Sequence, residues 1–94
     1  MVIRMRASLA EEEISIVKES LRRELTLSEA KVNLIREEIE GFEKRYEMSS
    51  EEFMDKFECG EVGDDQDYFE WWGLVRGLKK IEEQIGKIKA VLAY

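Results

Sequence analysis

The sequence predicts an all-α protein: a long helical hairpin with coiled-coil-like apolar stripes and a short intervening helix, oligomerising into a bundle. Three observations predict this fold. The 94 residues include no proline, apolar residues recur every three or four positions over two long segments, and a helix-start signal precedes each segment. Because the chain is short, we assign residues 1–94 to a single small helical domain.

The first long helix is expected over residues 8–46. Ser8 and Glu11 have the spacing of a capping box, in which each side chain bonds the other residue's backbone N–H. The apolar stripe that follows consists of Ile14, Val17, Leu21, Leu25, Ser28, Val32, Ile35, Ile39, Phe42 and Tyr46. Its spacing is irregular near residues 25–28, and a second capping box starts at Thr26. The sequence therefore leaves open whether this helix is continuous or broken there.

Residues 1–7 are expected to form an arm or a short strand. In this segment Ile3 and Met5 alternate with Arg4 and Arg6, which is the period of an extended chain. This alternation is the sole strand signal in the sequence, and it covers only a few residues.

A short helix is expected over residues 50–57. Ser49 is at the N-cap position of this helix. Glu52 is at the third helical position, where its carboxylate could accept a hydrogen bond from the backbone N–H of Ser49. Met48 would pack against Phe53 as a hydrophobic staple. Gly60 marks the end of this helix, since glycine readily takes the left-handed conformation that ends many helices.

The second long helix is expected over residues 65–92, with Asp64 or Asp65 as its cap. Its heptad-like apolar stripe consists of Trp71, Leu74, Leu78, Ile81, Ile85, Ile88 and Leu92. Gly73 and Gly77 leave a smooth patch where another helix could approach. Two such stripes are more than one hairpin can cover, so a homodimer or a larger bundle is expected.

The middle of the chain combines acidic and aromatic residues. The whole chain has a net charge of −7, whereas residues 47–70 contain ten acids and one base, a net charge of −9. This composition predicts a protein-binding module in which charge steers a small basic partner and rings anchor it. The residues expected to bind the partner are Phe53, Phe57, Glu61, Asp64, Asp65, Asp67, Tyr68, Phe69, Trp71 and Trp72.

Other function classes lack their usual residues. The chain has no histidine, no paired nucleophile and base, and no glycine-rich phosphate loop, so we predict neither an enzyme nor a cofactor. The acids do not follow the register of a calcium loop, and one cysteine cannot complete a zinc site, so no metal is expected. A single Cys59, without a signal-like N-terminus or a long apolar run, indicates a cytoplasmic protein. A composition rich in Glu, Lys and Arg is typical of thermophile proteins.

Two alternative functions remain open from the residues. A strand followed by two helices resembles the ribbon-helix-helix DNA-binding modules over residues 2–46, in which Arg4 and Arg6 would read bases in the major groove. The protein would then be a DNA-binding autoregulator. The other alternative is a structural, self-assembling coiled-coil protein.

Residues 46–83 contain three short motifs: a Met-Ser-x-Glu-Glu-Phe start at Met48–Phe53, a Gly-Glu-x-Gly-Asp-Asp turn at Gly60–Asp65, and Glu70 followed by Trp71. With these motifs the segment resembles a group of small prokaryotic acidic helical proteins that are taken for antitoxins. The resemblance implies that the protein neutralises a small toxin by binding it. It implies no catalytic residues.

Overall fold

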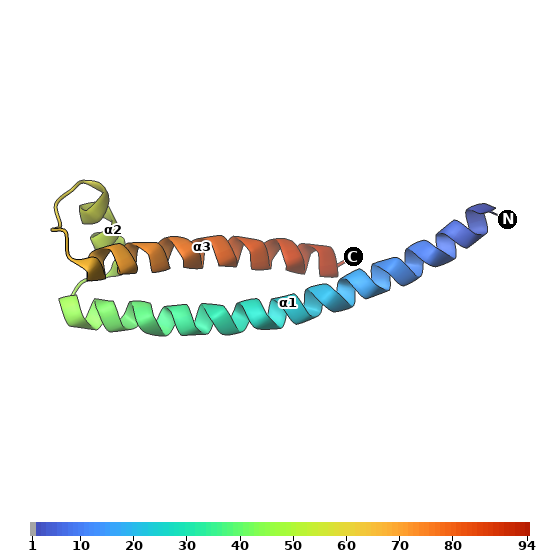
Figure 1. Ribbon diagram of the computed structural model, residues 1–94, viewed down its shortest axis with the longest axis horizontal. Coiled ribbons are helices and arrows are strands. Elements are labelled where there is room, and N and C mark those ends of the chain that lie inside the picture. The colour runs from blue at the N-terminus through green and yellow to red at the C-terminus, as the bar shows by residue number, and fades with distance from the viewer. Residues whose placement is uncertain (1) are drawn as a thin grey trace.

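The computed structural model describes the backbone of residues 2–94 and the side chains of residues 10–94. Three helices follow one another: α1 over Val2–Tyr46, α2 over Ser50–Glu58 and α3 over Gln66–Leu92. α1 and α3 lie side by side and antiparallel, and α2 packs across the end where the chain turns back (Figure 1). In the described backbone every regular element is a helix. The predicted all-α hairpin with a short intervening helix is therefore confirmed.

α1 is continuous through the region where the sequence left a break open. The hydroxyl of Thr26 donates to the backbone oxygen of Arg22 at 3.1 Å, and the hydroxyl of Ser28 donates to Glu24 Oε1 at 3.4 Å. Both side chains are thus bonded within the helix, as serine and threonine in helix interiors often are. Ser28 is also only 6% exposed in the contact with α3. Packing of this face keeps the helix intact despite the capping signal at Thr26.

The start of α1 differs from the expectation for the first residues. The strand predicted within residues 1–7 is wrong, because the backbone is helical from Val2 onward. Ser8 consequently lies inside the helix, and the predicted cap at this position is also wrong. A strand needs a neighbouring strand for its backbone hydrogen bonds, whereas a helix satisfies them within the segment. Met1 lies outside the described residues.

The remaining helix ends agree with the predicted signals. Ser49 caps α2, and its hydroxyl accepts a hydrogen bond from the backbone N–H of Glu52 at 3.1 Å. Gly60 follows α2 with φ of 73°, the left-handed conformation that glycine adopts without strain. Of the two candidate caps for α3, Asp65 is the one used, because its carboxylate accepts from the backbone N–H of Asp67 at 3.0 Å.

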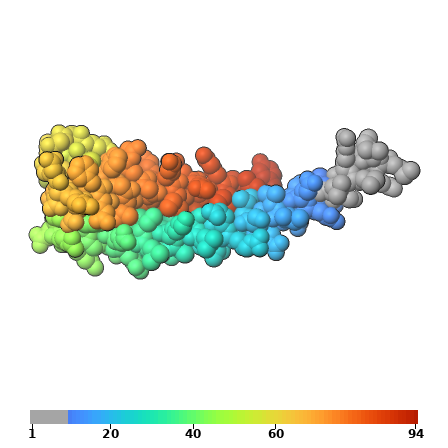
Figure 2. All heavy atoms as spheres, viewed as in Figure 1, coloured from blue at the N-terminus to red at the C-terminus, as the bar shows by residue number. Residues whose placement is uncertain are grey.

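The two arms of the hairpin differ in length. α1 has 45 residues and α3 has 27. The Lys18 ammonium donates to the backbone oxygen of Tyr94 at 2.6 Å, which places the end of α3 opposite Lys18. α1 continues beyond this point, and the molecule extends 67 Å along its long axis (Figures 1 and 2).

The core is concentrated at the closed end of the hairpin, beside α2. Its buried members are Ile39, Phe42, Phe53 and Trp71. Towards the open end, Val32, Ser28 and Ile88 are the buried residues among those with described side chains, and the other described stripe residues keep part of their surface exposed. Two helices alone cannot enclose a stripe on all sides, so most of the stripe residues outside the core are half-buried. None of the described helices is both long and apolar enough to cross a membrane.

Candidate partner-binding surface

The acid-aromatic segment, residues 47–72, folds into α2, the loop after it and the first turns of α3. Its carboxylates are on the outside: all but Asp67 belong to exposed residues. The exposed acids are Glu47, Glu51, Glu52, Asp55, Glu58, Glu61, Asp64, Asp65 and Glu70. The closed end of the hairpin therefore presents a strongly negative surface to solvent.

Two of the predicted partner-binding rings lie wholly inside the protein. Phe53 and Trp71 are 0% exposed, and their rings stack with centroids 3.9 Å apart and an interplanar angle of 2°. Trp71 also stacks on Phe42 and Tyr46, at 5.8 and 5.9 Å. In this structure the two rings join the three helices and leave no surface for a partner.

Trp71 and Trp72 have different environments although they are neighbours in the chain. The indole N–H of Trp71 donates to the hydroxyl of Ser50 at 2.9 Å, and the backbone N–H of Ser50 donates to Glu43 Oε2 at 2.9 Å. These bonds connect all three helices. The indole N–H of Trp72 is buried and has no hydrogen-bond partner among the described residues. Trp72 is therefore held by ring contacts rather than by polar ones.

An aromatic row runs along the outer side of α2 and α3. We define it as Phe69, Phe57 and Trp72. Phe57 meets Phe69 edge-on at 5.5 Å and stacks on Trp72 at 5.5 Å, and the Arg76 guanidinium lies over the Trp72 ring at 5.2 Å. Phe69 is 53% exposed, whereas the other two rings are half-buried. Of the predicted aromatic anchors, Phe69 offers the most surface to a partner.

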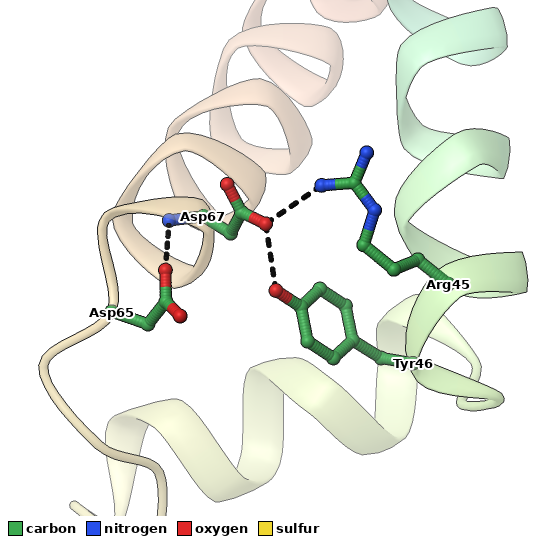
Figure 3. Close-up of polar contacts among 4 residues, drawn as sticks. All are labelled: Arg45, Tyr46, Asp65 and Asp67. Atoms are coloured by element: carbon green, nitrogen blue, oxygen red, sulfur yellow. Dashed lines mark hydrogen bonds and ion pairs between the residues drawn. The ribbon is translucent and has the colours of Figure 1, made fainter.

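Asp67 is the one acid of the segment that is tied into the fold. Its Oδ2 accepts from the Tyr46 hydroxyl at 2.7 Å and from the Arg45 guanidinium at 2.8 Å (Figure 3). These bonds join the end of α1 to the start of α3. The bond from Tyr46, followed by that from Arg45, lowers the pKa of Asp67 below its ordinary value. The same carboxylate, first through the hydrogen bond, raises the pKa of Tyr46 to about 12 and also raises the pKa of Arg45.

The pKa shifts of this cluster give a testable pH dependence. The pKa of Tyr46 is raised from 10.0 to about 12, so its contribution to stability is complete below pH 10 and is lost as the pH rises through 12. The pKa of Asp67 is lowered from 3.8, so its contribution is present above that pH and is lost as the pH falls below it. We expect Asp67→Asn to return the pKa of Tyr46 towards 10. NMR titration of the tyrosine ring carbons, within the pH range where circular dichroism shows intact helices, measures this.

The control for this titration is Asp64→Asn, which removes a nearby exposed carboxylate that accepts no hydrogen bond among the described side chains. The pKa of Tyr46 should stay near 12 in that variant. A wild-type pKa near the ordinary tyrosine value would contradict the observed hydrogen bond.

A groove lies between α2 and α3 on the same end of the molecule. It has a volume of about 940 Å³ and is open to solvent. Its α2 wall carries the carboxylates of Glu51, Asp55 and Glu58, and its α3 wall carries Arg76, Lys79 and Lys80 together with Glu83. Ser50, Met54, Val75 and Gly77 complete the lining. Among the described side chains no ion pair joins the two walls.

The predicted smooth patch on α3 is open rather than packed. A side-chain carbon added at Gly73 or at Gly77 would meet nothing within 4 Å. No other helix of the described chain approaches α3 closely at these positions. At Gly77 the missing side chain widens the groove.

The other predicted sites have these positions. Glu61 and Asp64 lie exposed in the loop after α2, and Tyr68 is half-buried against Phe53 and Tyr46. Cys59 is an exposed free thiol. The side chains of the possible DNA-reading residues Arg4 and Arg6 lie outside the described residues. Within the described part of the chain no three potential ligand side chains gather as a metal site would require.

Sequence reasoning missed the basic wall of the groove as part of the candidate surface. The sequence alone predicts no partner-binding role for Arg76, Lys79 or Lys80. These residues belong to the groove because α2 packs beside this part of α3. No local pattern in the sequence specifies that contact.

Comparisons of the chain with known protein families, with curated proteins and with solved structures found no match. The candidate site therefore rests on its geometry and charge.

Proposed function

We propose that the protein is a protein-binding module of antitoxin type, which neutralises a small basic partner at the closed end of the hairpin. The observation that carries the proposal is the aromatic row, bordered by exposed carboxylates and by an open groove. Charge on such a surface raises the rate of encounter with a basic protein, and exposed aromatic surface supplies affinity after contact.

The packing beneath the surface supports this role. Phe57 and Trp72 are fixed by ring contacts, and the fully buried Phe53 and Trp71 lie under them. A surface that is already ordered loses little conformational entropy when it binds. The module would therefore bind its partner without first having to fold.

The groove supports one orientation of the partner. A partner helix lying in it would place basic side chains towards Glu51, Asp55 and Glu58, and acidic side chains towards Arg76, Lys79 and Lys80. The reverse orientation would bring like charges together, which is unfavourable in a partly desolvated groove. The exposed acids of the loop, Glu61 and Asp64, would extend the contact to a basic surface beyond the groove.

Charge reversal tests the proposal. We expect tagged protein, purified at low salt from its source organism, to retain a stoichiometric small basic protein. Glu61→Lys with Asp64→Lys should reduce retention about tenfold or more, because each reversal replaces an attraction by a repulsion. Both side chains are exposed and form no hydrogen bond with another described residue, and the backbone N–H of Glu61 can keep its bond to the backbone oxygen of Lys56 in the variant, so the fold should be unaffected. Measuring retention as a function of salt gives an independent readout, since screening weakens exposed charge contacts.

The matched control is Glu37→Lys with Glu40→Lys, which makes the same change in net charge at exposed positions of α1. Retention should be nearly unchanged in this variant. Equal loss in both variants would show that only net charge matters, and undiminished retention in the Glu61 and Asp64 variant would refute the proposed surface. Expression of the captured partner alone should arrest growth and co-expression should restore it. Growth unaffected by the partner would remove the antitoxin role while leaving the binding role.

A further inference from the structure

Most of the projecting part of α1 lies beyond the end of α3 in the described chain. Because Lys18 contacts the backbone oxygen of Tyr94, residues 2–17 of α1 extend beyond the end of α3. At 1.5 Å per residue this projection is about 24 Å long. It is the arm on the right of Figure 1, opposite to the end that carries α2.

The apolar stripe of the hairpin continues onto this projection. Ile14 and Val17 occupy the same stripe as Leu21 and Leu25, yet both are 53% exposed. They line an open groove of about 380 Å³ whose other side is formed by Val91 and Tyr94 at the end of α3. The apolar stripe of α1 thus continues beyond the end of α3, and its residues there are exposed. An exposed apolar stripe on a helix is typical of a surface that packs against another molecule.

The charges at this end of the molecule are complementary between two separate segments. Residues 10–20 of α1 contain four acids and one base, a net charge of −3, and residues 84–94 at the end of α3 contain two bases and no acid, a net charge of +2. Within one chain most of the acidic segment lies beyond the end of the basic one. The two segments can face each other fully only when they belong to different molecules.

We propose that a second copy of this chain covers the projection in an antiparallel dimer. The projecting α1 of each protomer lies along the open end of the other protomer's hairpin, so that Ile14 and Val17 cover its half-buried stripe. Glu11–Glu13 then face Lys87 and Lys89 of the partner subunit. A two-fold axis makes every contact twice and produces a four-helix region in the middle of the dimer.

Charge decides between the antiparallel and the parallel arrangement. A parallel pair in register would bring Glu11–Glu13 of both copies together, and like charges at neighbouring positions of paired helices are destabilising. The antiparallel pair replaces this repulsion by attraction between a segment of net charge −3 and one of net charge +2. It also leaves the acidic closed end of each hairpin free at the two ends of the dimer, so the inference does not depend on the proposed function.

The mass of the protein in solution tests the dimer. Sedimentation equilibrium should give twice the chain mass of 11.1 kDa, and Ile14→Asp should raise the dimer dissociation constant about a hundredfold, because the substitution occurs twice in each dimer. The matched control is Leu34→Asp, at a residue 62% exposed on a different face of α1, which should leave the dissociation constant unchanged. Since neither side chain is buried, both variants should fold. A monomer at every concentration, or equal effects of both variants, would overturn the proposal.

Disulfide cross-linking tests the direction of the two chains. In a Cys59→Ser background, Glu12→Cys with Lys89→Cys should give a covalent dimer on mild oxidation with diamide. Lys89 lies beside Glu29 in its own chain, about 25 Å along α1 from Glu12, which is too far for a disulfide within one chain. Each single variant should remain uncross-linked. Cross-linking of the Glu12→Cys variant with itself would demonstrate the parallel arrangement and refute the antiparallel one.

Discussion

Trp71→Ala should lower the free energy of unfolding by about 3–5 kcal/mol, the range for removing a fully buried large aromatic side chain. The Trp71 ring is 0% exposed and lies between Phe53 at 3.9 Å and Phe42 at 5.8 Å. The substitution also removes the donor that bonds Ser50. Because this ring contacts residues of all three helices, the whole hairpin should melt at a lower temperature. Urea denaturation followed by circular dichroism measures the change.

The neighbouring tryptophan supplies a matched control. Trp71→Phe loses the hydrogen bond to Ser50 and should cost about 1–2 kcal/mol more than Trp72→Phe. In Trp72→Phe the same change removes a buried indole N–H that has no partner, so its effect should be within about 1 kcal/mol of zero. Equal effects at the two positions would show that the difference in hydrogen bonding does not govern their roles.

The sequence predicts the hairpin well because its signals are local. The apolar stripe of α1 follows a helical period over many turns, and Ser49, Gly60 and Asp65 each act on a helix end a few residues away. Where two local signals competed, at Thr26, packing against α3 decided the outcome. The start of α1 was predicted wrongly because two alternating apolar residues carry little information about a strand without a partner.

The candidate surface was less predictable because it depends on contacts between distant residues. Adjacent residues of a helix point about 100° apart, so the sequence could show that Trp71 and Trp72 differ but not which of them is buried. The position of α2 decides it, since Phe53 stacks on Trp71. In the same way, the bonds of Asp67 to Tyr46 and Arg45 cross more than twenty residues of chain. No local pattern separates Asp67 from the exposed acids on either side of it.

The two ends of the hairpin therefore differ in what they leave exposed. The closed end has a packed core covered by exposed acids and one ring, Phe69, that remains 53% exposed. The open end has a thin core and an apolar stripe that continues onto an uncovered helix. A surface supported by a packed core suits binding of a separate partner, whereas an incomplete core is stabilised by a further copy of the same helices.

Phe53→Ala should cost about 3–5 kcal/mol, but its effect should be local, in contrast to that of Trp71→Ala. Phe53 is the one buried residue of the nine-residue α2, and its ring contacts Trp71, Phe57 and Tyr68. A helix of nine residues is unstable alone in water, so α2 should detach when this ring is removed. α1 and α3 should stay paired, because Trp71 keeps its stacking on Phe42 and Tyr46.

Amide hydrogen exchange separates the local effect from a global one. In Phe53→Ala the amides of α2 should exchange rapidly while those around Val32 and Ile39 of α1 remain protected. Phe69→Ala is the control, since that ring is half-exposed and its removal should change the stability little. Loss of protection in all three helices together would show that α2 is part of the global folding unit. Because Phe57 lies on α2 and contacts the other two rings of the aromatic row, a detached α2 should also abolish partner retention. Phe69→Ala should weaken retention in a protein that is still fully folded.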